Sequence, residues 1–599
     1  MSVLLDKIFE NRGYYDRNDN GLTYLEEISQ MNHAVPKDTD ALCCRLDYHK
    51  RQGNLVVLLT DFDMDGIMCG VLGYAGLSEL GFSVGLFRPS VSEGYGFFAS
   101  TIDALVKEFP DVKAILTADV GISCSDAITY AMERYGVEVL VTDHHVVSRF
   151  PVKASVVVDP QRPDDEGSFS EICGAAVLYE VLLYYARHYT ENVNYMVSQI
   201  QRLIVFAGFG TVSDIMPLVY ENREYVRGAL SVCRLLCDKD RPSLVMSLPG
   251  CNVYRCAFYG LFILFSVFAE KKISGMTDVN EFWESAIGFR LAPAFNSVKR
   301  LGEDINIAYD VFFGSNPDGA VRQLISLNDK RRRLVEKYMK EMLEVPQPWG
   351  PYIYITKAPG GICGLMAQRV TQDRGYPAIV LRDNGNGYSG SGRCPGWLPF
   401  LSSMPANASW YAAGHENAFG VAAENDAVID DLAAFLKDRV DELKPDDFGA
   451  WVPDAVVSMF GDGDVEPTVD ILADYLDEVQ RFHPFGRAFE APSLLLKVNL
   501  EQVDFVFMGA RQQHLKLMLS DSVEVILWSY SDLLADSLVR VSPASDDERH
   551  VRDYLMYRGD DPCLELKGDF QYNVYGGRRS IQFGVNKDNV LSGGGVVHA

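Results

Sequence analysis

Short apolar runs and longer helical stretches alternate along the first third of the chain. The apolar runs, residues 55–60, 114–118 and 137–142, have the length of buried β-strands. The stretches between them, such as 68–81 and 123–135, are long enough for crossover helices between parallel strands. This alternation predicts an α/β fold with a doubly wound parallel sheet.

Each apolar run ends on acidic or histidine residues. These residues are Asp61, Asp63 and Asp65 after the first run, Asp119 after the second, and Asp143, His144 and His145 after the third. Residues two apart on an extended segment point to the same side, so the first three carboxylates would repel one another without a cation. Ligands gather at the carboxyl ends of strands in such a sheet, and carboxylates suit magnesium or manganese. The sequence therefore predicts one metal cluster.

A helix N-cap is the alternative interpretation of an aspartate that follows a strand. It accounts for Asp119 or Asp214 taken singly. It does not account for three aspartates between Asp61 and Gly66 together with an Asp-His-His sequence at another strand end. We therefore favour the metal interpretation.

The 599 residues are too many for one core and predict several domains. After the acidic sheet the pattern becomes helical and ends in an amphipathic stretch at 325–343. A second, smaller α/β region follows, with a Gly-rich stretch at 385–396 that we interpret as flexible, and then short alternating strands typical of an OB-like β-barrel. The predicted segments are an N-terminal leader at 1–50, a catalytic sheet domain at 51–225, a helical connector at 226–345, the second α/β domain at 346–445 and the barrel at 446–599.

The net charge of −27 argues against a protein that coats nucleic acid through charge alone. It is compatible with a metal-dependent nuclease, because divalent ions invert the potential of an acidic site. No apolar run reaches the ~18–20 residues of a membrane span, and the first residues resemble no signal peptide, so we expect a cytoplasmic protein without a membrane partner. The cysteines are scattered and form no Cys-x-x-Cys zinc pattern.

The acidic motifs also carry a family resemblance. Four motifs, in this order, resemble those of the DHH phosphoesterase superfamily: Asp-x-Asp-x-Asp-Gly at 61–66, Thr-Ala-Asp-Val-Gly at 117–121, Thr-Asp-His-His at 142–145 and Gly-Thr-Val-Ser-Asp at 210–214. Within this superfamily the chain resembles the RecJ-like single-stranded-DNA-specific exonucleases. That resemblance includes Glu-Gly-Tyr-Gly at 93–96, Ser-Gly-Ser-Gly-Arg at 389–393 and Gly-His-Glu-Asn-Ala at 414–418.

The resemblance implies hydrolysis of single-stranded DNA from a 5′ end, with release of nucleoside 5′-monophosphates during DNA repair or recombination. It implies two divalent cations, Mn2+ or Mg2+, held by Asp61, Asp63, Asp65, Asp119, His144 and Asp214. Asp119 is the expected bridge between the two ions. His145 is either a further ligand or a donor to the attacked phosphate, and Asp143 orients the histidine pair. Single-stranded DNA is the implied partner, and single-strand-binding protein or other repair and replication proteins are candidates.

The second α/β domain, DHHA1-like by the same resemblance, is expected to supply groups that bind phosphate. The expected substrate-binding residues are Arg393, Ser391, Gly414, Asn296, Arg300 and Arg88, and His415 is an expected catalytic residue. Three positions depart from the family pattern. Ala413 replaces the first glycine of Gly-Gly-His, Ala294 replaces an arginine expected to contact nucleic acid, and Ser90 replaces an arginine for which Arg88 is the nearest substitute.

Aromatic residues of the barrel, including Phe482, Phe570 and Tyr572, lie near basic residues such as Arg579. They could stack on bases or form the barrel core, and we favour the core for most of them. Two other functions remain open. A phosphodiesterase of short oligonucleotides or cyclic dinucleotides would need no strand-binding barrel, whereas an inactive replication-associated scaffold would have lost the carboxylates that this sequence retains.

Overall fold

The computed structural model describes residues 2–14, 28, 34–88, 96–147, 152–236, 248–273, 282–445, 452–509, 513–528, 563–575, 578–585 and 590–592. The chain divides into two compact units, one formed by residues 1–30 with 451–599 and the other by residues 31–450. Ser90 and the first three residues of the Glu-Gly-Tyr-Gly motif lie outside the described residues. The domain boundaries near 225, 345 and 445 remain predictions.

A five-stranded parallel sheet in the order β2-β1-β3-β4-β5 lies at the centre of the larger unit. Its strands are β1 (Leu55–Thr60), β2 (Val84–Phe87), β3 (Val112–Ala118), β4 (Glu138–Thr142) and β5 (Val156–Val158). Alternate residues of β1 enter two different cores, Val56 and Leu58 on one face and Val57 and Leu59 on the other. The predicted doubly wound α/β sheet is therefore confirmed.

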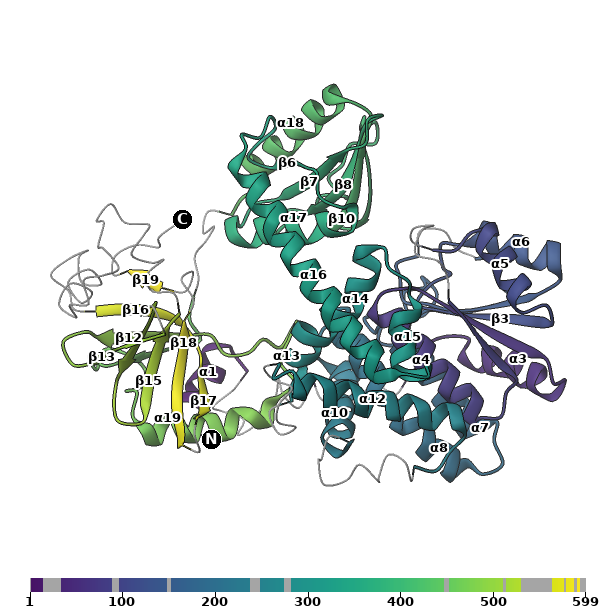
Figure 1. The fold of residues 1–599 in the computed structure, drawn as a ribbon, viewed down its shortest axis with the longest axis horizontal. Coiled ribbons are helices and arrows are strands. Elements are labelled where there is room, and N and C mark those ends of the chain that lie inside the picture. Colours follow the sequence, from purple (N-terminus) through teal and green to yellow (C-terminus); the bar gives the residue numbers. More distant parts are fainter. Residues whose placement is uncertain are drawn as a thin grey trace. The chain divides into compact units, whose positions relative to one another are not determined.

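Helices cover both faces of this sheet (Figure 1). The first face carries α3 (Thr39–Arg51), α4 (Met64–Glu79) and α7 (Gly174–His188), and the second carries α5 (Ala99–Glu108) and α6 (Ser125–Tyr135). The first core continues into α8 (Val193–Arg202), α9 (Ile204–Ser213), α10 (Tyr220–Leu236), α12 (Asn252–Glu270), α13 (Glu284–Ala286), the π-helical turn η3 (Ile287–Leu291), α14 (Ala292–Leu301) and α15 (Asn306–Phe313). The larger core thus lies on the face that α4 covers.

Helix α12 contains the aromatic-rich stretch at 257–269. Among the described residues, α12 is the one helix long and apolar enough to cross a membrane. Half of its most apolar window is buried inside the protein, and Phe258, Leu261 and Leu264 belong to the first core. Packing within the unit therefore accounts for its composition.

The 28-residue helix α16 (Pro317–Glu344) packs on α14 and α15 and then on the second lobe (Figure 1). The sheet of that lobe has the order β6-β7-β8-β10-β9. Its elements are β6 (Ile353–Thr356), α17 (Gly360–Arg374), β7 (Ala378–Asp383), β8 (Tyr388–Arg393), β9 (Tyr411–His415), β10 (Ala418–Ala423) and α18 (Asp426–Leu443). Helices α17 and α18 pack in different cores on the two faces of this sheet.

The middle of the Gly-rich stretch of the second lobe, Tyr388–Arg393, is the regular strand β8. Ser391 and Arg393 lie in β8, which pairs with β7 on one side and β10 on the other. A Cβ atom at Gly392 would overlap the ring of Phe419, so this glycine allows the sheet to pack against its core. The interpretation of this stretch as flexible is therefore wrong.

The smaller unit contains two sheets, in the orders β11-β12-β16-β19 and β13-β14-β15-β18-β17. Its strands are β11 (Ala455–Ser458), β12 (Leu494–Asn499), β13 (Asp504–Met508), β14 (His514–Met518), β15 (Val523–Leu527), β16 (Cys563–Gly568), β17 (Phe570–Tyr575), β18 (Arg578–Val585) and β19 (Val590–Ser592). Its helices are α1 (Val3–Asn11), α19 (Val469–Val479) and the 3-10 turn η4 (Gln480–Phe482).

The first helix of the chain packs in this smaller unit. The edge of the Phe9 ring meets Phe482 with the ring centroids 4.9 Å apart. Arg12 donates to both carboxylate oxygens of Asp454 at 2.7 Å. The structure therefore divides the predicted leader at 1–50, because α3 packs in the core of the larger unit.

Candidate metal centre

The turn from β1 into α4 carries the first two aspartates. Asp61 is 4% exposed, and among the described residues nothing donates to its Oδ1 atom. Asp63 is the N-cap of α4, since its Oδ1 accepts the N–H groups of Asp65 at 3.1 Å and Gly66 at 3.3 Å. The alternative N-cap interpretation thus applies to Asp63. The cap uses one of its carboxylate oxygens and leaves Oδ2 as a possible ligand.

Asp65 is fixed by the start of another helix. Its Oδ2 accepts the N–H of Gly174 at 2.7 Å, and its Oδ1 accepts that of Ala175 at 3.2 Å. These are the first residues of α7, where the helix dipole favours an anion. A Cβ atom at Gly174 would lie 2.6 Å from the Cβ of Asp119, so glycine allows α7 to begin against both aspartates.

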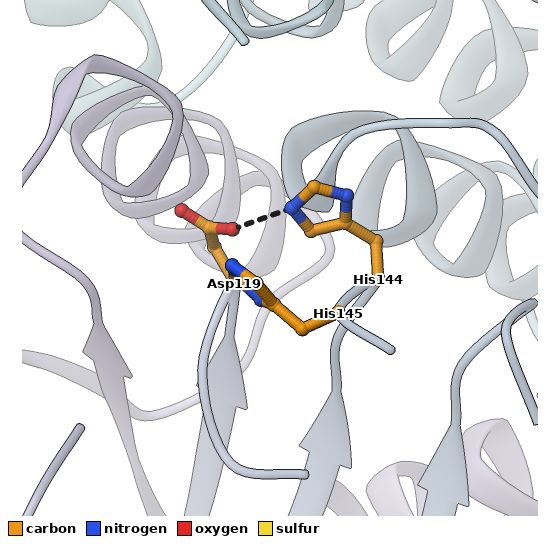
Figure 2. A group of neighbouring side chains, drawn as sticks. All are labelled: Asp119, His144 and His145. Carbon is orange, nitrogen blue, oxygen red and sulfur yellow. Dashed lines mark ion pairs between the residues drawn. The ribbon is translucent and has the colours of Figure 1, made fainter. Parts of the chain in front are cut away.

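Asp119 and His144 meet at the carboxyl ends of β3 and β4. Asp119 has a φ of 62°, a left-handed conformation that aspartate tolerates better than most residues. The Nε2 atom of His144 lies 3.1 Å from Asp119 Oδ1, as Figure 2 shows. The same nitrogen lies 3.6 Å from Asp214 Oδ2, at the end of α9, and 4.0 Å from Asp65 Oδ2. His144 therefore lies among three carboxylates.

The described residues contain three groups whose ligand atoms all lie within 4.8 Å of one another. These groups are Asp61-Asp63-Asp119, Asp65-His144-Asp214 and Asp119-His144-His145. Asp119 and His144 each belong to two groups, so the three form one continuous acidic centre. The sequence predicts this convergence, and the roles of the individual residues as ligands remain predictions.

The carboxylates of this centre are unfavourable without a cation. Burial, and then the charge of Asp63, raise the pKa of Asp61 and of Asp65 to about 7. Burial, and then the neighbouring carboxylates, also raise the pKa of Asp119 and Asp214 well above the ordinary range. Oxygen-rich sites of this kind favour hard divalent ions, which would offset the repulsion.

The two histidines differ in charge. Burial lowers the pKa of His144 to about 4, so its ring is neutral at pH 7 and can offer a lone pair. His145 Nδ1 lies 2.8 Å from Asp143 Oδ1. Burial lowers the pKa of His145, but this hydrogen bond and the charge of Asp143 outweigh burial and raise it to about 9. His145 is therefore protonated at neutral pH in the metal-free protein.

Asp143 is held in place by backbone groups. It is fully buried, and it accepts the N–H groups of Ile122 at 2.8 Å and His144 at 2.8 Å as well as the ring of His145. Burial raises the pKa of Asp143, but the hydrogen bond from His145 and the charge of His145 hold it below its ordinary value. The geometry therefore fits the predicted orienting role of Asp143.

We expect the metal-free protein to become more stable as the pH falls from 7 to 5. The pKa of Asp61 is about 7 in the folded state and about 3.9 in an unfolded chain, so over this range the folded state holds a proton that the unfolded state releases. This contribution is complete below pH 4 and is lost as the pH rises through 7. Urea unfolding in EDTA should show about 2 kcal/mol less pH dependence in Asp61→Asn than in the natural chain. Parallel pH profiles would contradict the raised pKa of Asp61.

Comparisons with known proteins find related domains and relatives that cover most of the chain. The family model of the DHH family, N-terminal domain, matches residues 55–207, and that of the RecJ OB domain matches residues 462–587. The single-stranded-DNA-specific exonuclease RecJ of Escherichia coli (strain K12) is 22% identical over 86% of this chain and 86% of that protein. RecJ of Bacillus subtilis (strain 168) is 26% identical over 78% of this chain and 55% of that protein. The chain therefore contains a DHH-family N-terminal domain and a RecJ OB domain, and it is similar to RecJ over most of its length.

A solved structure shares the fold of this RecJ-like chain. The crystal structure of RecJ in complex with Mn2+ from Thermus thermophilus matches 98% of this chain and 75% of that chain, with a TM-score of 0.70 and 19% identity. The OB-like architecture predicted for the C-terminal region is confirmed by the RecJ OB match.

The second lobe of the RecJ-like chain presents its polar residues on one face of its sheet. Ala418 of β10 pairs with Arg393 of β8 on one side and with His415 of β9 on the other. Directly paired residues project to the same face, so Arg393 and His415 flank a small residue and stand about 10 Å apart. Ser391 occupies the next row of the same face, opposite Gly420. Helix α17 packs against β8 beside these residues, since a Cβ atom at Gly364 would lie 3.1 Å from Arg393 Nη2.

Gly414 adopts a φ of 137°, which L side chains rarely adopt, so glycine is needed directly before His415. Loss of hydration, and then the charge of His145, lower the pKa of His415. His415 therefore lies within the electrostatic influence of the acidic centre. Ala413, the predicted departure from Gly-Gly-His, is exposed in β9.

Two other arginines and Asp63 lie near Arg300. Burial, and then the charges of Arg331 and Arg393, lower the pKa of Arg300 to about 10, while Asp63 opposes this shift. Burial is also the first cause of the lowered pKa of Arg393. Arg331 and Arg393 thus disfavour the positive charge of Arg300, and an anion placed beside Arg300 would offset this repulsion.

Two other predicted substrate-binding residues already have protein partners. Asn296 Oδ1 accepts the N–H of Met64 at 2.8 Å, at the start of α4. Arg88 donates to Asn306 Oδ1 at 2.8 Å and lies 3.7 Å from Asp310. Asn296 can still offer its NH2 group, whereas Arg88 would have to leave α15 to reach a substrate. Their roles as substrate contacts remain predictions.

The sequence motifs missed two residues near the centre. Asp159 follows β5, is fully buried, and has a pKa raised to about 7 by burial and then by Asp143. Its position after an apolar strand is the signal that could have found it. Lys299 lies 3.8 Å from Asp61, and its position one helical turn after Asn296 is the corresponding signal.

The predicted aromatic and basic residues of the barrel mostly contact one another. Tyr572 donates to Asp477 of α19 at 2.9 Å, and the Arg579 guanidinium lies 3.3 Å from the centroid of the Tyr572 ring. Arg579 also lies 3.5 Å from Asp477. Phe570 and Phe583 are buried, with ring centroids 4.8 Å apart. These contacts favour internal packing over base stacking at these positions.

Proposed function

We propose that this RecJ-like chain is an exonuclease that hydrolyses single-stranded DNA from a 5′ end and releases nucleoside 5′-monophosphates. The observation that carries the proposal is the continuous acidic centre, in which Asp119 and His144 each belong to two candidate ligand groups. The relatives described above are named single-stranded-DNA-specific exonucleases. DNA repair and recombination in the cytoplasm form the proposed setting, with single-strand-binding protein or other repair and replication proteins as candidate partners.

Two divalent cations, Mn2+ or Mg2+, are the proposed cofactors. The residues fit them, because oxygen atoms dominate the centre, Asp61 Oδ1 has no donor among the described residues, and the carboxylates repel one another. Asp61, Asp63 and Asp119 would hold one ion, and Asp65, His144 and Asp214 the other, with Asp119 shared. When bound, such a pair of ions neutralises the attacked phosphate and activates water.

The side chains around the centre have separate proposed tasks. Asp143 orients His145 and keeps it protonated, so that Nε2 of His145 can donate to the attacked phosphate. His415 would approach the same phosphate from the second lobe. The fixed backbone contacts of Asp143 and the positive φ of Gly414 hold these two histidines before the substrate arrives.

The second lobe would bind the terminal phosphate of the strand. Arg393, Ser391 and His415 project from one face of its sheet, and Arg300 adds a further charge from α14. Guanidinium groups bind phosphate through paired, charge-assisted hydrogen bonds. Recognition of a 5′-phosphate by these residues would fix the position of the strand end relative to the acidic centre. It would therefore determine which phosphodiester is cleaved.

Replacement of Arg393 by alanine should weaken binding of a 5′-phosphorylated strand by about 1.5–3 kcal/mol, because charge-assisted hydrogen bonds are lost. Mn2+ binding should be unchanged. Affinities for 5′-phosphorylated and 5′-hydroxyl strands, measured by fluorescence anisotropy in Ca2+, would give the preference ratio. Arg439→Ala removes an arginine from α18, on the opposite side of the same lobe, and serves as the control. If Arg393→Ala kept the preference ratio of the natural chain, another residue would have to recognise the 5′-phosphate.

Digestion of 5′-labelled, 3′-labelled and circular single strands with Mn2+ tests the proposed function. We expect immediate release of the 5′ label as a mononucleotide, progressive shortening of the 3′-labelled strand, and no cleavage of circles. Tyr572 contacts both Asp477 and Arg579, so the barrel has fewer side chains that can stack on bases. This observation favours the alternative function of a phosphodiesterase of short oligonucleotides. That phosphodiesterase would cleave dinucleotides and leave long strands intact, whereas cleaved circles would contradict exonuclease action.

A further inference from the structure

Lys299 lies at the acidic centre without a role in the motifs described above. Its Nζ atom is 3.8 Å from Asp61 Oδ2 and 3.9 Å from the centroid of the Phe62 ring. The carboxylates of the centre are those of Asp61, Asp63, Asp65, Asp119 and Asp214. Within the part of the chain that the structure describes, no other lysine or arginine lies within 4.0 Å of them. Among the described lysines and arginines, Lys299 is thus the one closest to these carboxylates.

The position of Lys299 follows from the docking of α14. Asn296 Oδ1 accepts the N–H of Met64 at 2.8 Å, which fixes α14 against the first turn of α4. Lys299 follows one turn later on the same side of the helix. The buried Phe62 ring supports its ammonium group through a cation–π contact. The Lys299 side chain is 34% exposed, so its ammonium group can move into solvent while α14 stays in place.

An ammonium group and a divalent cation cannot both remain close to Asp61 without repelling each other. An ion held by Asp61, Asp63 and Asp119 would therefore displace the ammonium of Lys299 from Asp61. The displaced group would lie beside the centre, where the substrate phosphate is expected. Ala294, at the position of the missing family arginine, is 1% exposed and offers no charge there. Lys299 can supply that charge from the same helix.

We propose that Lys299 is an exchangeable counter-ion, which neutralises Asp61 in the metal-free protein and pairs with a phosphate of the single strand once a divalent ion is bound. The first half rests on the geometry of Asp61 and Lys299. The second half rests on the proposed function.

Mn2+ binding to the full chain tests the first half. Free Mn2+ measured by electron paramagnetic resonance should show about three- to tenfold tighter binding at the weaker site of Lys299→Met, because a competing charge is gone. Lys299→Arg keeps the charge and should stay within about twofold of the natural chain. Lys113→Met removes an exposed lysine from the opposite end of the same sheet, at the start of β3, and should behave likewise.

Thermal unfolding gives a second readout of the same exchange. In EDTA, Lys299→Met should unfold at a lower temperature than the natural chain, and saturating Mn2+ should remove the difference. Unchanged Mn2+ affinity together with an unchanged unfolding temperature in EDTA would overturn the counter-ion role. If Lys299→Met does not fold, Lys299→Gln removes the same charge and is judged by the same two measurements.

Single-turnover cleavage at saturating Mn2+ tests the second half. Lys299→Met should raise the strand concentration for half-maximal rate about tenfold and leave the maximal rate within about threefold, and Lys299→Arg should restore the natural value. An unchanged half-maximal concentration would overturn the phosphate contact. A natural chain that binds Mn2+ but cleaves no single strand would contradict the proposed function, while the Mn2+ measurements would still decide the counter-ion role.

Discussion

Replacement of Asp119 by asparagine is expected to lower the rate of single-stranded DNA cleavage by at least about three orders of magnitude. Asp119 belongs to two of the three candidate ligand groups, and we propose that the two ions share it, so its loss should affect both proposed ion sites. Asparagine keeps the size of the side chain and tolerates the φ of 62°. Single-turnover cleavage and the number of bound Mn2+ ions per chain are the measurements. A near-natural rate with an unchanged Mn2+ number would contradict the two-ion proposal.

The same substitution should stabilise the metal-free protein. Asp119 is 2% exposed, and neighbouring carboxylates surround it, so a neutral amide removes an unfavourable buried charge. We expect the free energy of unfolding in EDTA to rise by about 1–3 kcal/mol. Asp111→Asn, at an exposed position before β3, is the matched control and should change neither rate nor stability. Loss of both activity and stability in Asp119→Asn would indicate a structural role instead.

Asp65 would give a less clear test than Asp119. Its carboxylate accepts the N–H groups of Gly174 and Ala175, so Asp65→Ala would also remove the cap of α7. Loss of a helix cap costs about 0.5–2 kcal/mol. An inactive Asp65→Ala protein could therefore have lost an ion site, the start of α7, or both. The sequence alone gives no warning of this difference between the two aspartates.

Removal of the smaller unit is expected to weaken binding of long single strands by about one to two orders of magnitude and to leave cleavage of very short oligonucleotides intact. The protein to test is residues 34–445, without residues 1–33 and 446–599. It retains the cores of the sheet domain and of the second lobe, whose members lie between Leu42 and Val440. Residues 1–14 must be removed as well, because α1 would otherwise expose the apolar side that packs in the smaller unit.

Binding curves over a range of salt concentrations would measure this effect. The shorter protein should show a flatter salt dependence, since fewer phosphates are neutralised. Trp528, which is 45% exposed at the end of β15, offers a narrower version of the experiment, because Trp528→Ala removes one candidate stacking platform and leaves the unit in place. Long-strand affinity and salt dependence equal to those of the full chain would exclude the smaller unit from substrate binding.

The acidic centre could be predicted from the sequence because parallel strands end at one edge of a sheet. In this sheet β1, β3 and β4 are also neighbours, so Asp61, Asp119 and His144 converge. The parallel sheet itself followed from apolar runs spaced by helical stretches. Glycine occurs both in flexible segments and in tightly packed strands, so the glycines near residue 390 led to the wrong interpretation of this stretch as flexible.

Contacts between distant segments could not be predicted in the same way. The contact of Lys299 with Asp61 depends on how α14 docks against α4, which no local pattern encodes. The engagement of Arg579 with Asp477 likewise depends on the packing of α19 on the barrel. The family resemblance suggested Arg88 as a substrate contact, but its partner Asn306 on α15 is 218 residues away in the sequence. Such pairings require the tertiary structure.

The packing of α1 with the last quarter of the chain bears on how the protein is made. Arg12 pairs with Asp454 across 442 residues, and Leu4, Leu5, Ile8 and Phe9 are buried in the same unit. At about 5–20 residues per second, a ribosome needs roughly 20–90 s to synthesise that interval. The larger unit can fold on the ribosome during this time. The apolar side of α1 stays uncovered until residues 451–599, against which it packs, have been synthesised. The smaller unit is therefore completed only after its strands have emerged, so we expect the apolar side of α1 to be open to chaperones and proteases until then.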